Sequence, residues 1–237
     1  MANNYFRFKQ FTIIQDKSVF KVTTDGVLLG ALADIPYDGD LLDIGTGTGL
    51  IAIMAAQRSR CNIVAIEPHR DSYLQACENV SACPWSSRIK VENISFNEFY
   101  NRSDMQFDFI IANPPYFINS LLNPDKSKAS ARHAFSLTPD DLFSGSSFLL
   151  KESGSLQVIL PYPEGTLFIS AAAERGLYCN NIIRIKAVPS GPVIRLILKF
   201  EKKKRQTRES FLTIETGSIP KYTDEYIRAT RDFYLNF

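Results

Sequence analysis

Short apolar runs alternate with longer segments of helical periodicity from residue 40 to residue 176, and this alternation constrains the chain most. We expect strands at residues 40–44, 62–66, 88–92, 107–112 and 155–160, and helices at residues 50–60, 69–82, 138–150 and 164–176. Thr138 favours the start of the third helix, because Pro139 follows it at the first helical position. Strands joined through helices return to the sheet by long crossovers, so the pattern predicts a doubly wound parallel α/β sheet.

Two further strands close the pattern in a different way. Residues 179–188 and 193–200 are joined by the four residues Pro189-Ser190-Gly191-Pro192. A turn this short cannot connect parallel neighbours, so the last strand should run antiparallel. We therefore expect a mostly parallel sheet of seven strands with an antiparallel last strand.

The first residues indicate a short extension in front of this sheet. Residues 11–22 predict a hairpin that turns near Asp16 and Lys17, followed by a helix capped by Thr24 or Asp25. We interpret the chain as a single domain. It would comprise an N-terminal extension (residues 1–37), a catalytic core (residues 38–200) and a basic C-terminal segment (residues 201–237).

Composition excludes several classes of protein. Apolar residues make up 45% of the chain and charged residues 22%, as in ordinary globular proteins. The four cysteines form no C-x-x-C pair and only two histidines occur, so we expect neither a zinc site nor a disulfide framework. No apolar run of about 18 residues and no apolar leader is found, so we expect no membrane span and a cytoplasmic location.

Basic residues gather at two places although the net charge is only +2. Residues 199–208 contain six cations and one acidic residue, Glu201, and the centre of this run is Lys202, Lys203, Lys204 and Arg205. The first 24 residues are also more basic than acidic. Together these segments predict a surface that faces phosphates, with a solvated loop as the alternative.

A glycine-rich loop follows the first strand of the core. Gly45, Gly47 and Gly49 come directly after Asp43-Ile44, where the turn needs permissive backbone angles and a ligand must approach closely. Glu67 ends the next strand, where a carboxylate can accept hydrogen bonds from both ribose hydroxyls of an adenosine cofactor. The dinucleotide fingerprint G-x-G-x-x-G fails, because Leu50 stands where its third glycine is required.

The spacing D-x-G-x-G-x-G resembles motif I of the Class I S-adenosylmethionine methyltransferases. The resemblance implies a Rossmann-like fold, with S-adenosylmethionine held by Asp43, the three glycines and Glu67. It also implies that a residue after the third strand holds the adenine ring. Ser95 occupies that position where most relatives carry an acidic residue, and Phe96 beside it is expected to add ring packing or a backbone N–H. A neutral hydroxyl accepts a hydrogen bond more weakly than a carboxylate.

Asn113-Pro114-Pro115-Tyr116 follows the fourth strand, where strand ends open into the ligand crevice of an α/β sheet. An exocyclic amine or an amide nitrogen is a poor nucleophile, because its lone pair is delocalised. The side-chain carbonyl of Asn113 and the backbone carbonyl of Pro114 are acceptors that draw electron density onto such a nitrogen and stabilise developing positive charge. Tyr116 offers an aromatic face for a flipped base.

Other segments resemble the bacterial tRNA(Val) adenine-N6 methyltransferase family, which modifies the adenosine 3′ of the anticodon. The matching segments are Phe8-Lys9-Gln10-Phe11, residues 21–31 with Lys21 and Thr24-Asp25-Gly26, Glu78-Asn79-Val80, Pro84-Trp85, residues 222–226 and Phe233-Tyr234-Leu235. In that family the segment around Thr24, Asp25 and Gly26 lies against the amino-acid end of the cofactor. The resemblance implies tRNA(Val) as partner and the N6 of its adenosine 37 as target.

Residues 119–133 carry Lys126, Lys128 and Arg132 without strong periodicity. We hypothesise that this stretch orders over RNA. Three alternatives to a tRNA adenine-N6 methyltransferase remain open: a glutamine-amide methyltransferase that acts on release factor, an rRNA guanine-N2 methyltransferase, and an inactive RNA-binding module. The first usually carries a larger N-terminal domain and the second is commonly duplicated. Intact Asp43, Glu67, Asn113 and Tyr116 count against the third.

Overall fold

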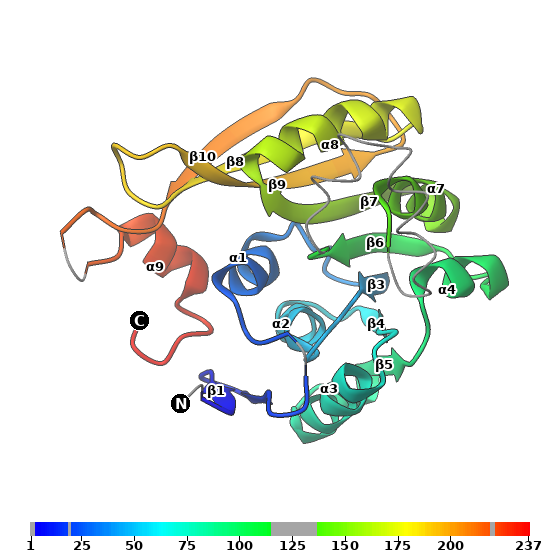
Figure 1. Cartoon of the computed structure of the whole chain (residues 1–237), viewed down its shortest axis with the longest axis horizontal. Helices are drawn as coiled ribbons and strands as arrows, with labels where there is room; N and C mark the ends of the chain where they lie inside the picture. Colours follow the sequence, from blue (N-terminus) through cyan, green and yellow to red (C-terminus); the bar gives the residue numbers. More distant parts are fainter. Residues whose placement is uncertain (1–2, 19, 115–136, 219–220) are drawn as a thin grey trace.

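The computed structural model describes residues 3–18, 20–114, 137–218 and 221–237. Its centre is an eight-stranded sheet in the order β10-β8-β9-β7-β6-β3-β4-β5 (Figure 1). The strands are β3 (Asp40–Ile44), β4 (Asn62–Ile66), β5 (Ile89–Glu92), β6 (Phe107–Ala112), β7 (Leu150–Pro161), β8 (Tyr178–Lys186), β9 (Val193–Glu201) and β10 (Arg208–Thr213). Within this sheet β9 alone runs antiparallel to its neighbours, β7 and β8, as the four-residue turn before it predicts.

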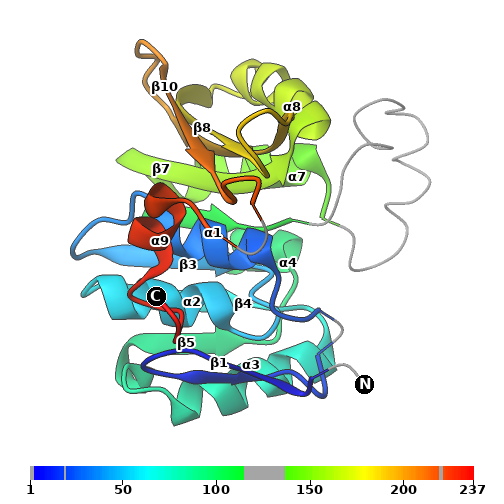
Figure 2. The same cartoon turned by 90° about the vertical axis from the view of Figure 1, so that its left-hand side faces the viewer.

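Helices cover both faces of the sheet, as Figure 2 shows from the side. One face carries α1 (Thr24–Leu32), α2 (Leu50–Arg58), α3 (Arg70–Ala82) and α9 (Asp224–Thr230), and the other carries α4 (Phe96–Arg102), α7 (Pro139–Leu149) and α8 (Tyr162–Glu174). Each layer encloses its own apolar core. On the second face, the rings of Phe143, Phe168 and Phe200 are fully buried and lie 4.3–6.4 Å apart. Aromatic rings at such distances add to the stability of burial.

The sheet has one strand more than the sequence predicts. β10 forms where we expected only a basic segment, and it pairs in parallel with β8. Its residues are mostly exposed and it lies at the edge of the sheet, so it lacks the apolar run that marks the inner strands. The C-terminal residues then form α9, which packs against α1 and β10.

The N-terminal hairpin lies earlier in the chain than predicted. β1 (Tyr5–Arg7) pairs with β2 (Thr12–Ile14), so the turn falls at residues 8–11 and not at Asp16-Lys17. The rings of Phe8 and Phe11 explain this position, because both are buried and stack with centroids 4.6 Å apart. The hairpin is fastened to α3, where Asn79 accepts from the N–H of Ile14 and donates to its carbonyl.

Polar side chains hold the segment after the hairpin, in which Val22 returns close to Gln15. Gln15 Oε1 accepts the N–H of Val22, and Gln75 Oε1 in α3 accepts the N–H of Lys17. These bonds use backbone groups that a hairpin at this position would have paired across its own strands. In the described ranges, no helix has the length and apolar character needed to cross a membrane.

Candidate active site

Three predicted site residues stand next to one another at the carboxyl edge of the sheet. Ile44 of β3 is in register with Ile66 of β4 on one side and with Ala112 of β6 on the other. The residues that follow these three are Gly45, Glu67 and Asn113. Parallel pairing therefore aligns the glycine loop, the carboxylate and the Asn-Pro motif in one row, at the edge where open α/β sheets bind ligands.

The glycine loop has the conformation that its composition predicts. Gly45, Gly47 and Gly49 have φ values of 69°, 59° and 83°, a region that side chains with a Cβ rarely adopt. A Cβ placed on Gly45 or Gly47 would meet no atom within 4 Å. The glycines are therefore required by the backbone angles, and the space in front of the first two is open for a ligand.

Glu67 is fixed from two sides. Its Oε2 accepts the N–H of Gly47 and its Oε1 accepts the N–H of His69, both at 2.9 Å, and the residue is buried. Burial raises the pKa of this carboxyl, while the two N–H groups oppose the rise. Each oxygen can accept a further hydrogen bond. The carboxylate is therefore positioned to accept hydrogen bonds from the hydroxyls of a ribose.

Asp43 lies beneath the loop and is completely buried. Its Oδ2 accepts the hydroxyl of Thr46 at 2.6 Å, whereas Oδ1 has no hydrogen-bond partner of good geometry among the described residues. Burial raises the pKa of this carboxyl to about 7, against the Thr46 hydroxyl and the Ala52 N–H, which lower it.

The open space at Gly45 and Gly47 and the fixed Glu67 carboxylate fit an adenosine-type cofactor. S-adenosylmethionine carries a ribose that matches Glu67 and has no pyrophosphate, so the loop needs no further glycine. A pocket of about 470 Å³ continues this site beyond β4 and β5; it is lined by Pro68, His69, Arg70, Asp71, Asn93, Ile94, Ser95 and Glu98. Among the described residues, no group of three or more histidine, cysteine or acidic side chains could hold a metal ion.

Asn93 is a pocket residue that we did not predict. It follows β5 as Glu67 follows β4, since Ile66 is in register with Glu92. Its amide nitrogen donates to the carbonyl of Glu67 at 2.8 Å and to that of Pro68 at 3.1 Å. Asn93 thereby fixes the backbone on which the ribose-facing carboxylate stands. Its place after a parallel strand was the available sequence signal.

The structure corrects the surroundings expected for Ser95 and Phe96. We expected no helix here, but Ser95 caps α4 through a capping box in which it accepts the N–H of Glu98 and donates to Glu98 Oε2 at 2.9 Å. Phe96 is buried against Gly145 of α7, where a Cβ would lie 2.5 Å from its ring. The Ser95 hydroxyl still borders the pocket, whereas the Phe96 ring belongs to the core.

The segment Thr24-Asp25-Gly26 lies beside the Asn-Pro motif, as the resemblance implies. A Cβ on Gly26 would lie 3.9 Å from Asn113 Nδ2. Thr23, and not Thr24 or Asp25, caps α1 by accepting the N–H of Gly26. Asp25 Oδ2 accepts from Arg195 Nε of β9 at 2.8 Å, which fastens the first turn of α1 to the sheet.

Around the motif, Asn113 is half-buried and Pro114 is buried. Tyr116 and the predicted RNA contacts Lys126, Lys128 and Arg132, with the rest of residues 119–133, lie outside the described residues. Lys21 is exposed near the start of α1.

The basic run lies at the other edge of the sheet. Antiparallel β9 begins beside the carboxyl end of β7, where Arg195 pairs with Pro161, and ends at Glu201 opposite Ser155. Six residue steps of about 3.3 Å carry the chain roughly 20 Å away from the glycine-loop edge. Lys202 Nζ donates to the carbonyl of Leu150, the first residue of β7. The structure therefore does not bring Lys202, Lys203, Lys204 and Arg205 together with Asn113.

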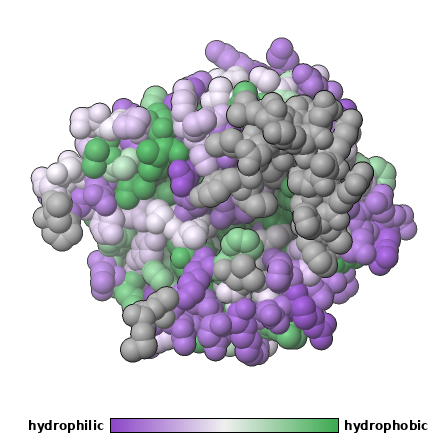
Figure 3. All heavy atoms as spheres, in the orientation of Figure 1, coloured by the Kyte–Doolittle hydropathy of each residue, from purple (hydrophilic) through white to green (hydrophobic). Residues whose placement is uncertain are grey.

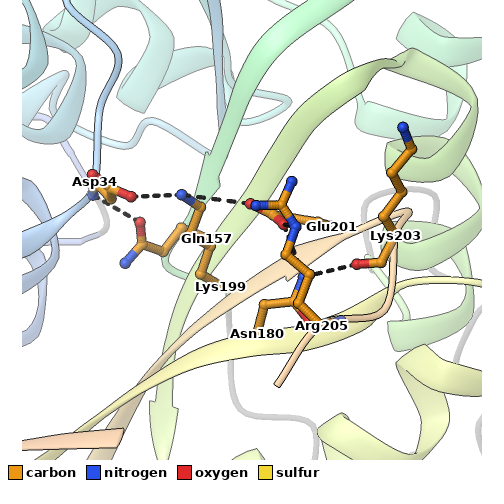
Figure 4. Close-up of polar contacts among 7 residues, drawn as sticks. All are labelled: Asp34, Gln157, Asn180, Lys199, Glu201, Lys203 and Arg205. Carbon is orange, nitrogen blue, oxygen red and sulfur yellow. Dashed lines mark hydrogen bonds and ion pairs between the residues drawn. The ribbon is translucent and has the colours of Figure 1, made fainter. Parts of the chain in front are cut away.

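Figure 4 shows how this turn is held. Asn180 donates to Glu201 Oε2 and to the carbonyl of Lys203, both at 2.8 Å, and accepts the N–H of Arg205. Arg205 pairs with Glu201 at 3.3 Å, and the Lys203 side chain points away from the network. Lys203 and Lys204 are exposed cations on a well-fixed turn.

Comparison with known proteins agrees with this geometry. The family model described as "methyltransferase small domain" matches residues 10–161. A tRNA1(Val) (adenine(37)-N6)-methyltransferase of Trichodesmium erythraeum is 42% identical and is matched over 100% of both chains. A protein of the same name from Bacteroides fragilis strain ATCC 25285 is 40% identical, with 99% of both chains matched.

Solved structures share the fold. A predicted O-methyltransferase from Agrobacterium tumefaciens superposes with a TM-score of 0.68 and 18% identity, covering 88% of this chain and 96% of its own. A ribosomal protein L11 methylase from Lactobacillus delbrueckii subsp. bulgaricus gives a TM-score of 0.59 at 18% identity, with 84% and 100% covered. At this identity the likeness concerns the fold, which is that of the Class I methyltransferases.

Proposed function

The chain belongs to the methyltransferase small domain family and, within it, to the tRNA1(Val) (adenine(37)-N6)-methyltransferases, and from this premise we propose that it transfers a methyl group from S-adenosylmethionine to the exocyclic N6 amine of an adenine in tRNA. The observation that carries the proposal is the row formed by Gly45, Glu67 and Asn113. In that row a cofactor site and an acceptor for an amine proton are immediate neighbours.

Each part of the row has its own task in this proposal. The backbone of Gly45 and Gly47 lets the cofactor approach closely, and Glu67 accepts its ribose hydroxyls. When bound, S-adenosylmethionine supplies an activated methyl group on a positively charged sulfur. The N-terminal turn of α1, from Thr24 to Gly26, closes the other side beside Asn113.

Asn113 and Pro114 activate the amine. Their carbonyl oxygens accept hydrogen bonds from the two protons of the N6 amine, which directs the nitrogen lone pair toward the methyl carbon. The same oxygens stabilise the positive charge that develops on nitrogen during transfer. Tyr116 holds the flipped base by stacking. The amine proton then leaves to water, so no side chain has to act as a strong base.

The finer assignment is adenosine 37 of tRNA1(Val). It is supported by the names of relatives that match the whole length of the chain at about 40% identity. The compartment that follows from such a substrate is the cytoplasm. We also propose that Lys21, Lys126, Lys128 and Arg132 contact the RNA near the active site. Lys202 to Arg205 contact a part of the RNA that lies far from the active site.

Transfer of labelled methyl from S-adenosylmethionine to bulk tRNA, taken from a strain that lacks this modification, tests the function. Nucleoside analysis should show label in N6-methyladenosine, recovered only from valine tRNA. Label in release factor or rRNA in place of tRNA would keep the methyl transfer and refute the substrate. Cofactor binding without label in any of these acceptors would refute all three substrate classes.

A further inference from the structure

The described residues 15–18 and 20–22 lie between the hairpin and α1, at the edge of the sheet that carries the site (Figure 2). Buried polar contacts hold them. Ser18 is buried and its hydroxyl donates to that of Ser72, which is fully buried in the first turn of α3, at 3.2 Å. Gln15 holds the far end of the segment by accepting the N–H of Val22 at 2.8 Å. These contacts therefore hold the described residues on either side of Phe20 and Lys21 in place.

This segment presents an aromatic ring and a cation. Phe20 is 60% exposed, and Lys21 beside it is exposed too. A single exposed apolar side chain is common on protein surfaces and by itself indicates no function. Phe20 is of interest because of its position near the candidate active site. Three residues later, Thr23 caps α1 and lies against Gly26, which neighbours Asn113. Three residues span at most about 10 Å, so the Cα of Phe20 lies within that distance of the Cα of Thr23.

The surroundings suit a nucleic acid more than an apolar partner. Figure 3 shows that the surface over α3 on this side is largely hydrophilic. Arg70, in the same helical turn as Ser72, is exposed and places its guanidinium over the ring of Tyr73 at 5.8 Å. Asp71 is exposed there as well, so the patch is not uniformly basic and the aromatic ring is its distinguishing feature.

We propose that Phe20 is a stacking platform for an unpaired RNA base next to the target adenine, with Lys21 paired to the adjoining phosphate. The inference rests on the proposed function and deepens it, since it concerns the nucleotides around the methylated one. A base that flips into the site leaves its neighbours in the loop without a stacking partner. An exposed ring on a fixed support replaces that partner, and a cation beside it neutralises the backbone.

Phe20→Ala tests the platform, and Phe211→Ala is the matched control, because Phe211 is 59% exposed on the edge strand β10. Loss of one stacked base should raise the KM for tRNA about 5- to 150-fold. The KM for S-adenosylmethionine and the melting temperature should stay as in the wild type, and Phe20→Trp should restore tRNA affinity. The logarithm of the tRNA binding constant falls linearly with the logarithm of the salt concentration, and Lys21→Ala should make this slope shallower by about 0.7.

The outcomes separate the platform from the function on which it rests. Failure of the wild-type protein to bind or methylate tRNA would refute the proposed function. An active wild type with equal tRNA affinity in Phe20→Ala and Phe211→Ala would overturn the platform alone. A parallel loss of cofactor affinity in Phe20→Ala would also overturn it, because the ring would then serve the cofactor site.

Discussion

Asp43 shows how far a single residue at the site departs from an ordinary surface carboxylate. It is fully buried and has a pKa of about 7, far above the value expected in the unfolded chain. A carboxyl whose folded pKa is raised favours the folded state below its unfolded pKa. That advantage is lost as the pH rises through the folded pKa. The stability of the cofactor-free protein should therefore fall between about pH 4 and pH 8.

Asp43→Asn should remove this dependence, because an amide keeps the shape and does not ionise. Relative to wild type, the free energy of unfolding of the variant should increase by up to about 4 kcal/mol between pH 4 and pH 8. Urea unfolding at several pH values measures it. Asp104→Asn, at an exposed position, serves as control. Equal pH dependence in wild type and Asp43→Asn would show that burial does not hold this carboxyl protonated.

Asn113 carries the largest expected effect on rate. Asn113→Ala removes one oriented acceptor from the amine and should lower kcat about 10²- to 10³-fold. Cofactor affinity should stay close to that of wild type, because the adenosine contacts lie at Glu67 and the glycine loop. Single-turnover kinetics and calorimetry with S-adenosylmethionine measure the two quantities. A loss of affinity as large as the loss of rate would contradict the role assigned to Asn113.

Among secondary-structure elements, α4 decides what Ser95 does. The helix has only seven residues and two buried apolar positions, Phe96 and Phe99, so its periodicity is too short to be recognised in the sequence. Its capping box engages the hydroxyl that we expected to face the adenine ring. The capping role of Ser95 and its expected contact with the adenine ring can be separated by comparing Ser95 with a capping residue outside the pocket.

Thr138 provides that comparison, because it heads α7 with the same type of capping box and does not line the pocket that Ser95 borders. Ser95→Ala and Thr138→Ala should each lower stability by about 1 kcal/mol. If Ser95 also contacts the adenine ring, as the resemblance to Class I methyltransferases implies, only Ser95→Ala should weaken cofactor binding, by less than tenfold for a neutral hydrogen bond. Unchanged affinity in both variants would leave Ser95 with the cap alone.

The elements that the sequence predicted best are those with strong local signals. β3, β4 and β6 begin and end at the predicted residues, because each is a buried apolar run bounded by polar or turn residues. Parallel pairing then placed the glycine loop, Glu67 and Asn113 at one edge, and this too followed from the sequence. The hairpin, β10 and α9 were missed or misplaced, because rings and side chains far apart in the chain determine them. The contacts of Lys9 with the carbonyls of Arg231 and Phe237 are one such case.

At the scale of the whole molecule, the direction of β9 places the basic run far from the candidate active site. The run gathers charge in the sequence, but its place in space follows from the antiparallel direction of β9, which the four-residue turn predicts and the charge pattern alone does not. The double variant Lys203→Ala with Lys204→Ala should weaken tRNA binding and lower its salt slope by about 1 to 2. The value of kcat should not change, because the run lies roughly 20 Å from the glycine-loop edge. An unchanged salt slope would assign these lysines to a solvated turn.

The most direct test of the account uses two transcripts of tRNA1(Val) that differ at position 37. The protein, with S-adenosylmethionine, should methylate the transcript with adenosine 37 and leave the one with guanosine 37 unlabelled. Asn113→Ala should give a rate about 10²- to 10³-fold lower on the first transcript. Equal label in both transcripts would contradict the assigned target, and a wild-type rate from Asn113→Ala would contradict the assigned site.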